Sequence, residues 1–313
     1  METNIDIRDA FFDELYNIAK KDSRVILLVA DMGAFSLIKF KNDFPGQFIN
    51  VGIAEQNMVS IAAGLALGGK KVFIYTIIPF ITQRCYEQVK IDLCSMNLPV
   101  TILGVGPGLT YGNDGPTHHG TQDIAIMRVL PEITILNPSD AIMAAASINI
   151  GYKNSSPTYI RIDKGKIPEI YNQASDFSDG LAELSQGKDL TIIATGIMAH
   201  QALKVAEELN NRLVSTGVVD LYRIKPLNKE KLLKIIDNSK RLVTLEENTI
   251  IGGIGSAVSE LLSDNGKTIP LKRIALPDQH CFESGDRESL LAFYNLDING
   301  IIKTILNEYG FKN

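Results

Sequence analysis

The chain alternates short apolar segments with longer segments in which apolar residues recur at helical spacing. The short segments are nearly continuous apolar runs, which is typical of parallel strands covered on both faces. In the first half, the predicted strands are Arg24–Asp31, Gln47–Gly52, Lys71–Ile78, Pro99–Val105, Glu132–Asn137 and Pro157–Ile162. The helices predicted between them are Ile7–Lys20, Ala54–Gly68, Phe80–Met96, Gln122–Val129 and Ser139–Ile150, with Ser139 as the N-cap of the last. This alternation predicts an α/β domain with a doubly wound parallel sheet.

The alternation lapses in a polar stretch rich in Pro, Gly and Ser, Lys164–Lys188, and then resumes. The later strands are predicted at Leu190–Gly196, Leu213–Leu221, Arg241–Glu247 and Ile269–Leu276. The later helices are predicted at Met198–Asn210, Lys229–Asn238, Gly255–Ser263, Glu288–Tyr294 and Ile298–Tyr309. We therefore expect two domains, each a mostly parallel sheet with helices on both faces. They cover residues 1–170 and 188–313, joined by a linker at 171–187.

Composition narrows the class of protein. The chain has 313 residues and a formal net charge of −5, and its Lys and Arg residues form no long run, which argues against a nucleic-acid partner. No uncharged apolar run is long enough to span a bilayer. The N-terminus is acidic and lacks the apolar segment of a signal peptide, and the three cysteines fit no zinc pattern. We expect a cytoplasmic protein that binds neither membranes nor nucleic acid.

Glu55 is unusual for its surroundings. It stands at the front of a predicted helix made almost entirely of small and apolar residues, in the stretch Val51–Tyr75. Burying a carboxylate is costly unless something pairs with it. A Glu in the first turn of a helix is ordinarily explained by the helix dipole. The position after a parallel strand, however, is where α/β sheets place ligands.

The segment Gly104–Asp123, "GVGPGLTYGNDGPTHHGTQD", is a second candidate site. It contains Asp114, His118 and His119, and it follows a predicted strand. A glycine-rich surface loop is the alternative interpretation, and the segment matches neither phosphate-binding glycine motif. A third candidate, Pro79–Pro99, places Phe80 where a strand turns into a helix. An aromatic residue there usually belongs to the core, but it could stack on a heteroaromatic ring.

These motifs resemble those of a known family. "GIAEQNM", "NLPV", "NDGPTHHG" and "NPSD", followed by "VDLYRIKPL", "VTLEENTIIGGIGSAVSE" and "ESGDRESLLAFYNL", come in the order seen in thiamine-diphosphate enzymes of the transketolase family and its 1-deoxy-xylulose-5-phosphate synthase relatives. The GDG…Asn motif with which such enzymes hold Mg²⁺ is absent from the chain. The chain therefore resembles the C-terminal subunit of a split transketolase, containing a pyrimidine-binding and a C-terminal domain. The resemblance implies an N-terminal partner subunit that carries GDG…Asn and Mg²⁺, and an α2β2 assembly.

The resemblance also implies roles for particular residues. Glu55 should face N1′ of the cofactor's aminopyrimidine and assist proton transfer at the 4′ nitrogen. Phe80 should stack on that ring, with Arg84 and Ile53 also at the cofactor. Asp114 and His118 should contact substrate hydroxyls, His118 as a catalytic residue. Arg161 should bind the substrate phosphate, and no metal ligand is expected in this chain. Ser36 and Arg8 are further candidates for binding phosphate, unless the substrate is not an ordinary sugar phosphate.

Two positions depart from the family pattern. Gly106 stands where transketolases carry a phosphate-binding His, and Pro107 where the deoxyxylulose synthases carry an Arg. The predicted activity is transfer of a two-carbon ketol unit from a ketose to an aldose, acting on sugars or sugar phosphates. Alternatives are a decarboxylating subunit of the deoxyxylulose-synthase or 2-oxo-acid dehydrogenase E1 β type, and a non-catalytic assembly subunit.

Overall fold

A computed structural model describes residues 5–311 of the chain. It divides into two compact units, which we call the first unit (Met1–Pro107 with Ile126–Ser175) and the second unit (Gly108–Ala125 with Asp176–Asn313). The glycine-rich segment that follows Pro107 thus groups with the second unit. The domain ranges 1–170, 171–187 and 188–313 stay a prediction.

The first unit contains a parallel sheet in which strands lie in the order β5-β6-β4-β3-β1-β2. The interior strands β1, β3, β4 and β6 are almost entirely buried, which explains their continuous apolar sequences. The bounds are β1 Val25–Val29, β2 Phe48–Asn50, β3 Lys71–Ile77, β4 Val100–Val105, β5 Thr134–Leu136 and β6 Thr158–Ile162.

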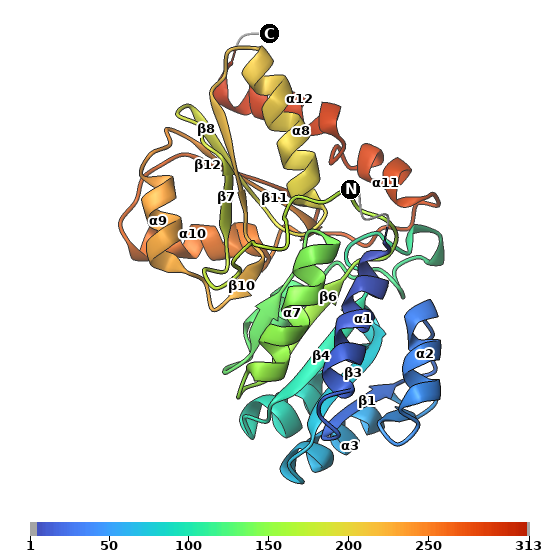
Figure 1. The fold of residues 1–313 in the computed structure, drawn as a ribbon. Helices are drawn as coiled ribbons and strands as arrows, with labels where there is room; N and C mark the ends of the chain where they lie inside the picture. The colour runs from blue at the N-terminus through green and yellow to red at the C-terminus, as the bar shows by residue number, and fades with distance from the viewer. Residues whose placement is uncertain (1–4, 312–313) are drawn as a thin grey trace. The chain divides into compact units, whose positions relative to one another are not determined.

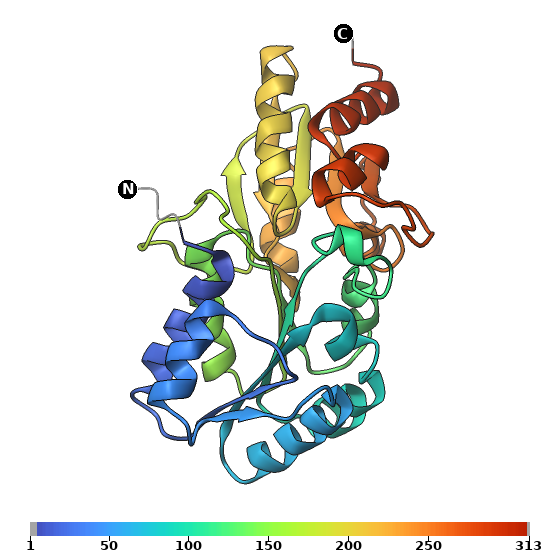
Figure 2. The same ribbon diagram turned by 90° about the vertical axis from the view of Figure 1, so that its right-hand side faces the viewer.

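Helices cover both faces of this sheet, as the sequence predicts. The helix α1 (Ile7–Ala19) packs against α7 (Ala141–Lys153) and α2 (Phe35–Asp43) on one face, and Figures 1 and 2 show α1 beside α7. On the other face α3 (Glu55–Leu67) packs against β3 and against a π-helical turn, η1 (Val89–Ser95). The short helices α4 (Ile78–Thr82), α5 (Tyr86–Gln88) and α6 (Asp123–Arg128) complete the connections.

The second unit contains a smaller sheet with strand order β12-β11-β8-β9-β7. All neighbouring pairs are parallel except β7 with β9. The bounds are β7 Ala182–Ser185, β8 Leu190–Ala194, β9 Thr216–Asp220, β10 Arg223–Lys225, β11 Leu242–Thr249 and β12 Leu271–Leu276. The strand β7 lies within the range predicted as a linker, where its polar sequence gave no strand signal, because an edge strand needs little apolar surface.

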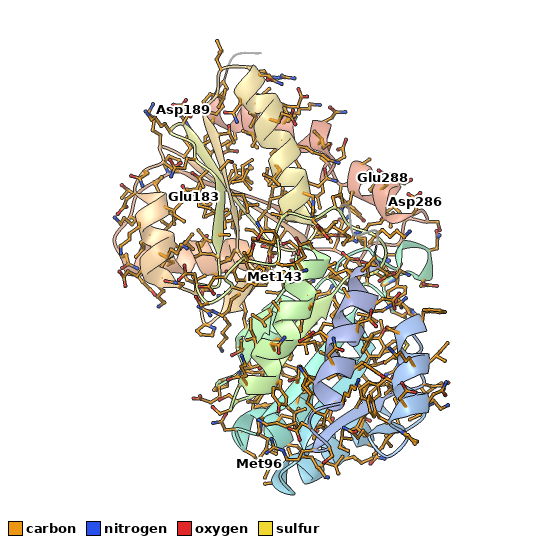
Figure 3. The ribbon with its side chains drawn as sticks, in the orientation of Figure 1. Met96, Met143, Glu183, Asp189, Asp286 and Glu288 are labelled. Carbon is orange, nitrogen blue, oxygen red and sulfur yellow. The ribbon has the colours of Figure 1, made fainter. Side chains whose placement is uncertain are left out.

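The helices of the second unit begin with side-chain caps in three places. Asn228, Asp286 and Asp297 each accept a hydrogen bond from a backbone N–H of the first turn. Figure 3 labels Asp286 and Glu288, which flank the start of α11. The bounds are α8 Met198–Asn211, α9 Lys229–Ile236, α10 Ile254–Asp264, α11 Arg287–Phe293 and α12 Ile298–Tyr309. Within residues 5–311, no helix has the length and apolar character needed to cross a membrane.

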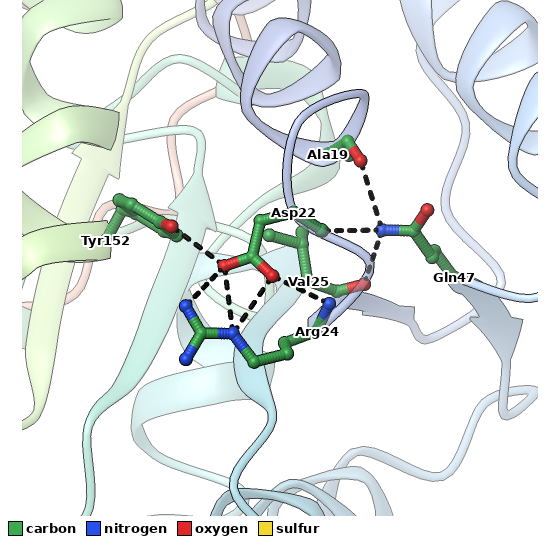
Figure 4. A network of polar contacts seen from close by, with 6 residues as sticks. All are labelled: Ala19, Asp22, Arg24, Val25, Gln47 and Tyr152. Atoms are coloured by element: carbon green, nitrogen blue, oxygen red, sulfur yellow. Dashed lines mark hydrogen bonds and ion pairs between the residues drawn. The ribbon is translucent and has the colours of Figure 1, made fainter.

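A polar network fixes the amino-terminal end of β1 (Figure 4). The Asp22 carboxylate accepts hydrogen bonds from Arg24 Nη2 at 2.8 Å and from the Tyr152 hydroxyl at 2.8 Å. The Gln47 side-chain amide donates to the carbonyl oxygens of Asp22 at 3.1 Å and Val25 at 2.9 Å. Side chains from α7 and from the segment before β2 therefore hold the turn between α1 and β1.

The predicted helix Phe80–Met96 is wrong as a single element. The chain forms α4, a turn, α5 and the π-helical η1 instead. In the turn, Gln83 N and Arg84 N both donate to the Pro79 carbonyl oxygen, at 2.9 and 3.1 Å. The Cys85 thiol also donates to the Phe80 carbonyl oxygen, at 3.1 Å. The bond from Gln83 N has the regular α-helical spacing of four residues, whereas the bond from Arg84 N spans five residues, as in a π-helix, and so the regular ladder ends here.

Two smaller differences concern helix starts. The predicted N-cap Ser139 is wrong, because the Asp140 carboxylate accepts the hydrogen bond from Met143 N at 2.8 Å. The second carboxylate oxygen of Asp140 accepts from the backbone amides of Ile170 and Tyr171, so this residue also ties down the segment after β6. The helix α2, which begins without a side-chain cap and has many exposed positions, gave too weak a pattern to predict.

Candidate active site

Glu55 is the first residue of α3 and is 2% exposed. The chain reaches it through a turn after β2 in which Gly52 has a positive φ of 72°. The Asn50 side-chain oxygen accepts from Gly52 N at 2.9 Å and from Asp31 N at 3.1 Å, which fixes this turn. Glu55 thus lies just beyond the carboxyl end of a parallel strand, as the sequence predicts.

Arg84 pairs with Glu55. Its Nη1 donates to Glu55 Oε2 at 2.9 Å, and its guanidinium carbon lies 4.1 Å from the centroid of the Phe80 ring. The Arg84 side chain is 44% exposed, whereas Glu55 is buried. The structure therefore brings Glu55, Phe80 and Arg84 together in one cluster, although they come from two different connections of the sheet. Ile53, the remaining candidate of this group, is 75% exposed just before α3.

Cys85 holds the turn that carries Arg84. Its thiol donates to the carbonyl oxygens of Phe80 and Ile81, each at 3.1 Å. Burial, with a smaller contribution from the negative charge of Glu55, raises the pKa of the Cys85 thiol to about 12. The thiol consequently stays protonated near neutral pH and serves as a hydrogen-bond donor rather than as a nucleophile.

Ser36 and Arg8 lie on neighbouring helices of the first unit. The Ser36 hydroxyl donates to Asp9 Oδ1 at 2.9 Å, which joins the start of α2 to α1. Burial lowers the pKa of Arg8, but Tyr75 and the carboxylates of Asp6 and Asp9 offset this effect, and the net shift is upward. Arg8 therefore remains a cation, and its side chain is 21% exposed.

Arg161 is a buried cation within the sheet. It lies on β6, is 3% exposed, and pairs in register with Gly104 of β4. A Cβ atom at Gly104 would lie 2.7 Å from the Ile78 side chain, so this position has no room for any other residue. A buried arginine is expected to have polar partners. Its place near the carboxyl end of β6 suits a residue that faces a ligand.

Asp114 and His118 share one turn of the glycine-rich segment in the second unit. Asp114 is the last residue of a 3₁₀ turn, η2 (Gly112–Asp114). His118 N donates to the Gly115 carbonyl oxygen at 2.9 Å, and the Thr117 hydroxyl lies 2.9 Å from His118 Nδ1. Asp114 is exposed and His118 half-buried, so both can meet a solute. Their neighbour His119 is buried, with Nε2 3.2 Å from the Gly112 carbonyl oxygen, which is a structural contact.

Sequence reasoning missed the polar cluster that holds this segment. Glu247, at the end of β11, accepts from Leu109 N at 2.7 Å and from Arg287 Nε at 2.9 Å. The available signal was the pair Glu246–Glu247 at the end of an otherwise apolar strand. No group of three or more possible metal-ligating His, Cys, Asp or Glu side chains is found among residues 5–311.

Comparison with known families identifies the chain. Residues 3–169 match the transketolase pyrimidine-binding domain, and residues 180–301 match the transketolase C-terminal domain. The chain belongs to the transketolase family.

Similar proteins include some of about the same length as this chain and others about twice as long. The chain is 37% identical over 302 residues to the B subunit of the apulose-4-phosphate transketolase of Phocaeicola vulgatus, covering 96% of each protein. It is 35% identical over 300 residues to the 6-deoxy-6-sulfo-D-fructose transketolase subunit SqwH of Clostridium sp. (strain MSTE9), covering 92% of that protein. It is also 36% identical to the 1-deoxy-D-xylulose-5-phosphate synthase of Caldanaerobacter subterraneus subsp. tengcongensis, of which it covers 48%.

A solved structure supports the same assignment. A protein described as a split gene transketolase in an inactive β4 tetramer superimposes with a TM-score of 0.90 at 32% identity, covering 99% of this chain and all of that one. Transketolase from Pichia stipitis matches with a TM-score of 0.80 at 19% identity, which supports the fold alone.

The Glu55 cluster fits the cofactor that a pyrimidine-binding domain of this family implies, thiamine diphosphate. An aminopyrimidine is a flat ring with nitrogen atoms at its edge. It needs an aromatic or apolar face for stacking and a carboxyl group that can hydrogen-bond a ring nitrogen. Phe80 and Glu55 supply these two features, and the planar Arg84 guanidinium already contacts both.

Proposed function

We propose that the chain is the C-terminal subunit of a two-subunit, thiamine-diphosphate-dependent transketolase that moves a two-carbon ketol unit from a ketose to an aldose. The observation that carries this proposal is the buried Glu55 carboxylate at the start of α3, beside the Phe80 ring, in a pyrimidine-binding domain. The match to one subunit of a split transketolase over 96% of both chains supports the two-subunit form.

Glu55 is the proposed acid–base residue at the cofactor. When bound, thiamine diphosphate supplies the carbon nucleophile that no side chain offers. Glu55 would hold a proton at N1′ of the pyrimidine and so favour the tautomer in which the 4′ nitrogen can accept a proton. Phe80 would orient the ring by stacking, and exposed Ile53 would border it.

Arg84 is proposed to contact the cofactor in a different way from Glu55. Its guanidinium now makes the two contacts that we assign to the aminopyrimidine, a hydrogen bond to Glu55 and a stack on Phe80. A bound ring would take over these contacts, and the 44% exposed Arg84 side chain has solvent-accessible space into which to move. The diphosphate and its Mg²⁺ would be held by the partner subunit.

The proposed substrate residues fall into two groups by role. Asp114 and His118 would bind substrate hydroxyls, with His118 taking part in proton transfer near the reacting carbon. Arg161, Arg8 and Ser36 would bind an anionic group of the sugar. Gly106 and Pro107 offer no side-chain donor, so backbone amides of the glycine segment would have to complete an anion site there.

The substrate itself is proposed only as a class. Two relatives are named for apulose 4-phosphate and for a sulfonated fructose, which are not the usual pentose phosphates. By analogy, we propose a polyhydroxylated ketose donor that carries an anionic group, a phosphate or a sulfonate, and that is not one of the usual pentose phosphates. The α2β2 assembly and the cytoplasmic location stay predictions.

A product analysis of the reconstituted enzyme tests the proposed reaction. The chain is combined with its N-terminal partner, thiamine diphosphate and Mg²⁺, and is given phosphorylated, sulfonated and unmodified ketoses with an aldose acceptor. We expect a chain-lengthened ketose and no CO₂ from these donors. Pyruvate with an aldehyde acceptor is the control: release of CO₂ with a 1-deoxy product would support the decarboxylating alternative. Absence of any conversion in an assembled complex that binds the cofactor would support the assembly-subunit alternative.

A further inference from the structure

Glu247 is a buried carboxylate with partners from two distant parts of the second unit. It is 5% exposed at the carboxyl end of β11. Its Oε1 accepts from Leu109 N at 2.7 Å, and both oxygens accept from Arg287 Nε, at 2.9 and 3.0 Å. Arg287 Nη2 donates as well, so the ion pair is bidentate.

The first partner is the base of the glycine-rich segment. Gly108 and Gly120 exchange two backbone hydrogen bonds, of 2.8 and 2.9 Å, and so close a loop that we call the 108–120 loop. Leu109 N, the next amide, points at Glu247. A Cβ atom at Gly108, whose φ is +58°, would lie 2.3 Å from Glu247 Cδ. Backbone and carboxylate thus meet at a distance that only glycine permits.

The second partner lies at the start of α11. Arg287 follows Asp286, which caps this helix by accepting from Ser289 N at 2.8 Å. The same region touches the 108–120 loop a second time, because a Cβ atom at Gly112 would lie 2.5 Å from the Gly285 carbonyl oxygen. Glu247 therefore joins the base of the 108–120 loop to the start of α11, and the residues just before α11 also pack against the middle of the loop.

This arrangement is energetically demanding. A buried, bidentate ion pair becomes costly when one partner is removed, because the other charge is left desolvated. A bidentate ion pair also allows a smaller range of distances and orientations than a surface ion pair, so it restricts where Arg287 can lie relative to Glu247. The hydrogen bond from Leu109 N fixes the base of the loop to the same carboxylate. A single carboxylate that accepts from both a loop amide and a helix-start guanidinium is suited to fix the loop's position.

We propose that Glu247, paired with Arg287, is a positioning residue that fixes the 108–120 loop so that Asp114 and His118 meet the substrate. The inference rests on the roles proposed above for Asp114 and His118. Glu247 and Arg287 do not themselves touch the substrate in this scheme. They act by limiting the motion of the loop, and a displacement of about 1 Å at reacting groups can cost about a hundredfold in rate.

Glu246 provides a matched control on the same strand. It is 1% exposed and accepts from two backbone amides, Ile254 N at 2.9 Å and Gly255 N at 2.8 Å. These amides belong to the start of α10, not to the 108–120 loop. Glu246→Gln and Glu247→Gln therefore make the same chemical change at neighbouring buried carboxylates. The first changes contacts to the start of α10, and the second changes contacts to the 108–120 loop.

The experiment compares Glu247→Gln, Glu246→Gln and Arg287→Lys in the reconstituted two-subunit complex. Amide hydrogen exchange of residues 108–120 and steady-state kinetics with the ketose donor are measured for each. We expect faster exchange in the loop for Glu247→Gln and Arg287→Lys but not for Glu246→Gln. We also expect kcat/KM to fall about ten- to a hundredfold in those two variants, while the dissociation constant of thiamine diphosphate changes less than about threefold.

Arg287→Lys keeps the positive charge but cannot make the bidentate hydrogen bonds of the planar guanidinium. This variant keeps the test usable if Glu247→Gln fails to fold. Unchanged loop exchange in Arg287→Lys, or an equal loss of kcat/KM in Glu246→Gln, would overturn the inference. The proposed function fails separately, if the wild-type complex transfers no ketol unit or if Asp114→Ala and His118→Ala leave kcat/KM unchanged. The exchange measurement needs no substrate, so it tests the positioning role in either case.

Discussion

The buried carboxylates Glu55, Glu246 and Glu247 differ in the groups that donate hydrogen bonds to them. Glu246 accepts from two helix-start amides, and Glu247 from a loop amide and a guanidinium. Glu55 is hydrogen-bonded to a side chain that is itself 44% exposed. A buried charge with a displaceable partner suits ligand binding better than one enclosed by backbone donors. Of these three carboxylates, Glu55 has the most exposed side-chain partner, which suits exchange of that partner for a ligand.

Glu55→Gln should leave the fold intact and nearly abolish ketol transfer in the reconstituted complex. Glutamine has almost the same shape, but it cannot exchange a proton with a ring nitrogen, and acid–base assistance of this kind is worth roughly 10²–10⁴-fold. The measurement is kcat, with thiamine-diphosphate affinity by calorimetry and far-UV circular dichroism as controls. A variant that keeps kcat within about threefold of wild type would make Glu55 an ordinary helix-end carboxylate.

The residue scale also shows what a sequence can and cannot identify. Glu55 stood out because its helix is otherwise small and apolar. Its contact with Arg84 depends on the irregular turn after α4, which periodicity does not reveal. Glu247 was missed because adjacent acidic residues at a strand end look alike in sequence. Glu246 accepts from an amide eight residues away. Glu247 accepts from Leu109 N, 138 residues away, and from Arg287, 40 residues away, and neither contact can be read from the local sequence.

At the scale of elements, strongly periodic or continuously apolar segments were predicted well. The strands β3, β4, β8 and β12 and the helices α3, α8 and α12 lie within about two residues of their predicted bounds. The failures lie where polar contacts override the pattern, as in the broken α4–η1 region and the Asp140 cap. Short edge elements such as β7 and the exposed α2 carry too little apolar surface to show a period.

The Asp22 network gives a prediction for the α1–β1 junction. Side-chain hydrogen bonds from Arg24 hold the pKa of Asp22 well below its ordinary value. The folded chain thus keeps this carboxylate ionised where the unfolded chain binds a proton. Its stabilising contribution is complete above about pH 4 and is lost as the pH falls further.

Asp22→Asn should therefore lower the free energy of unfolding by roughly 1 kcal/mol at pH 7, and the deficit should shrink below about pH 4. The measurement is urea unfolding of the chain between pH 3 and pH 7. Tyr152→Phe is the matched control, since it removes the 2.8 Å hydrogen bond without changing any charge on Asp22. A deficit for Asp22→Asn that is constant across this range would contradict the assignment.

At the scale of the whole molecule, the chain combines two α/β units whose family assignments are independent of each other. The predicted cofactor residues Glu55, Phe80 and Arg84 belong to the first unit. The predicted substrate residues Asp114 and His118 belong to the second unit. That division was not visible in the sequence, because the glycine-rich segment follows a first-unit strand but packs with residues beyond position 240.

The central claim is that this chain supplies one half of a thiamine-diphosphate site. It is tested most directly by titrating a fixed amount of the chain with its N-terminal partner, in saturating thiamine diphosphate and Mg²⁺, and measuring the rate of ketol transfer. We predict no transfer by either polypeptide alone, and a rate that rises with added partner and saturates at one partner chain per chain. Ketol transfer at the full rate by the isolated chain, with no second polypeptide present, would contradict the account.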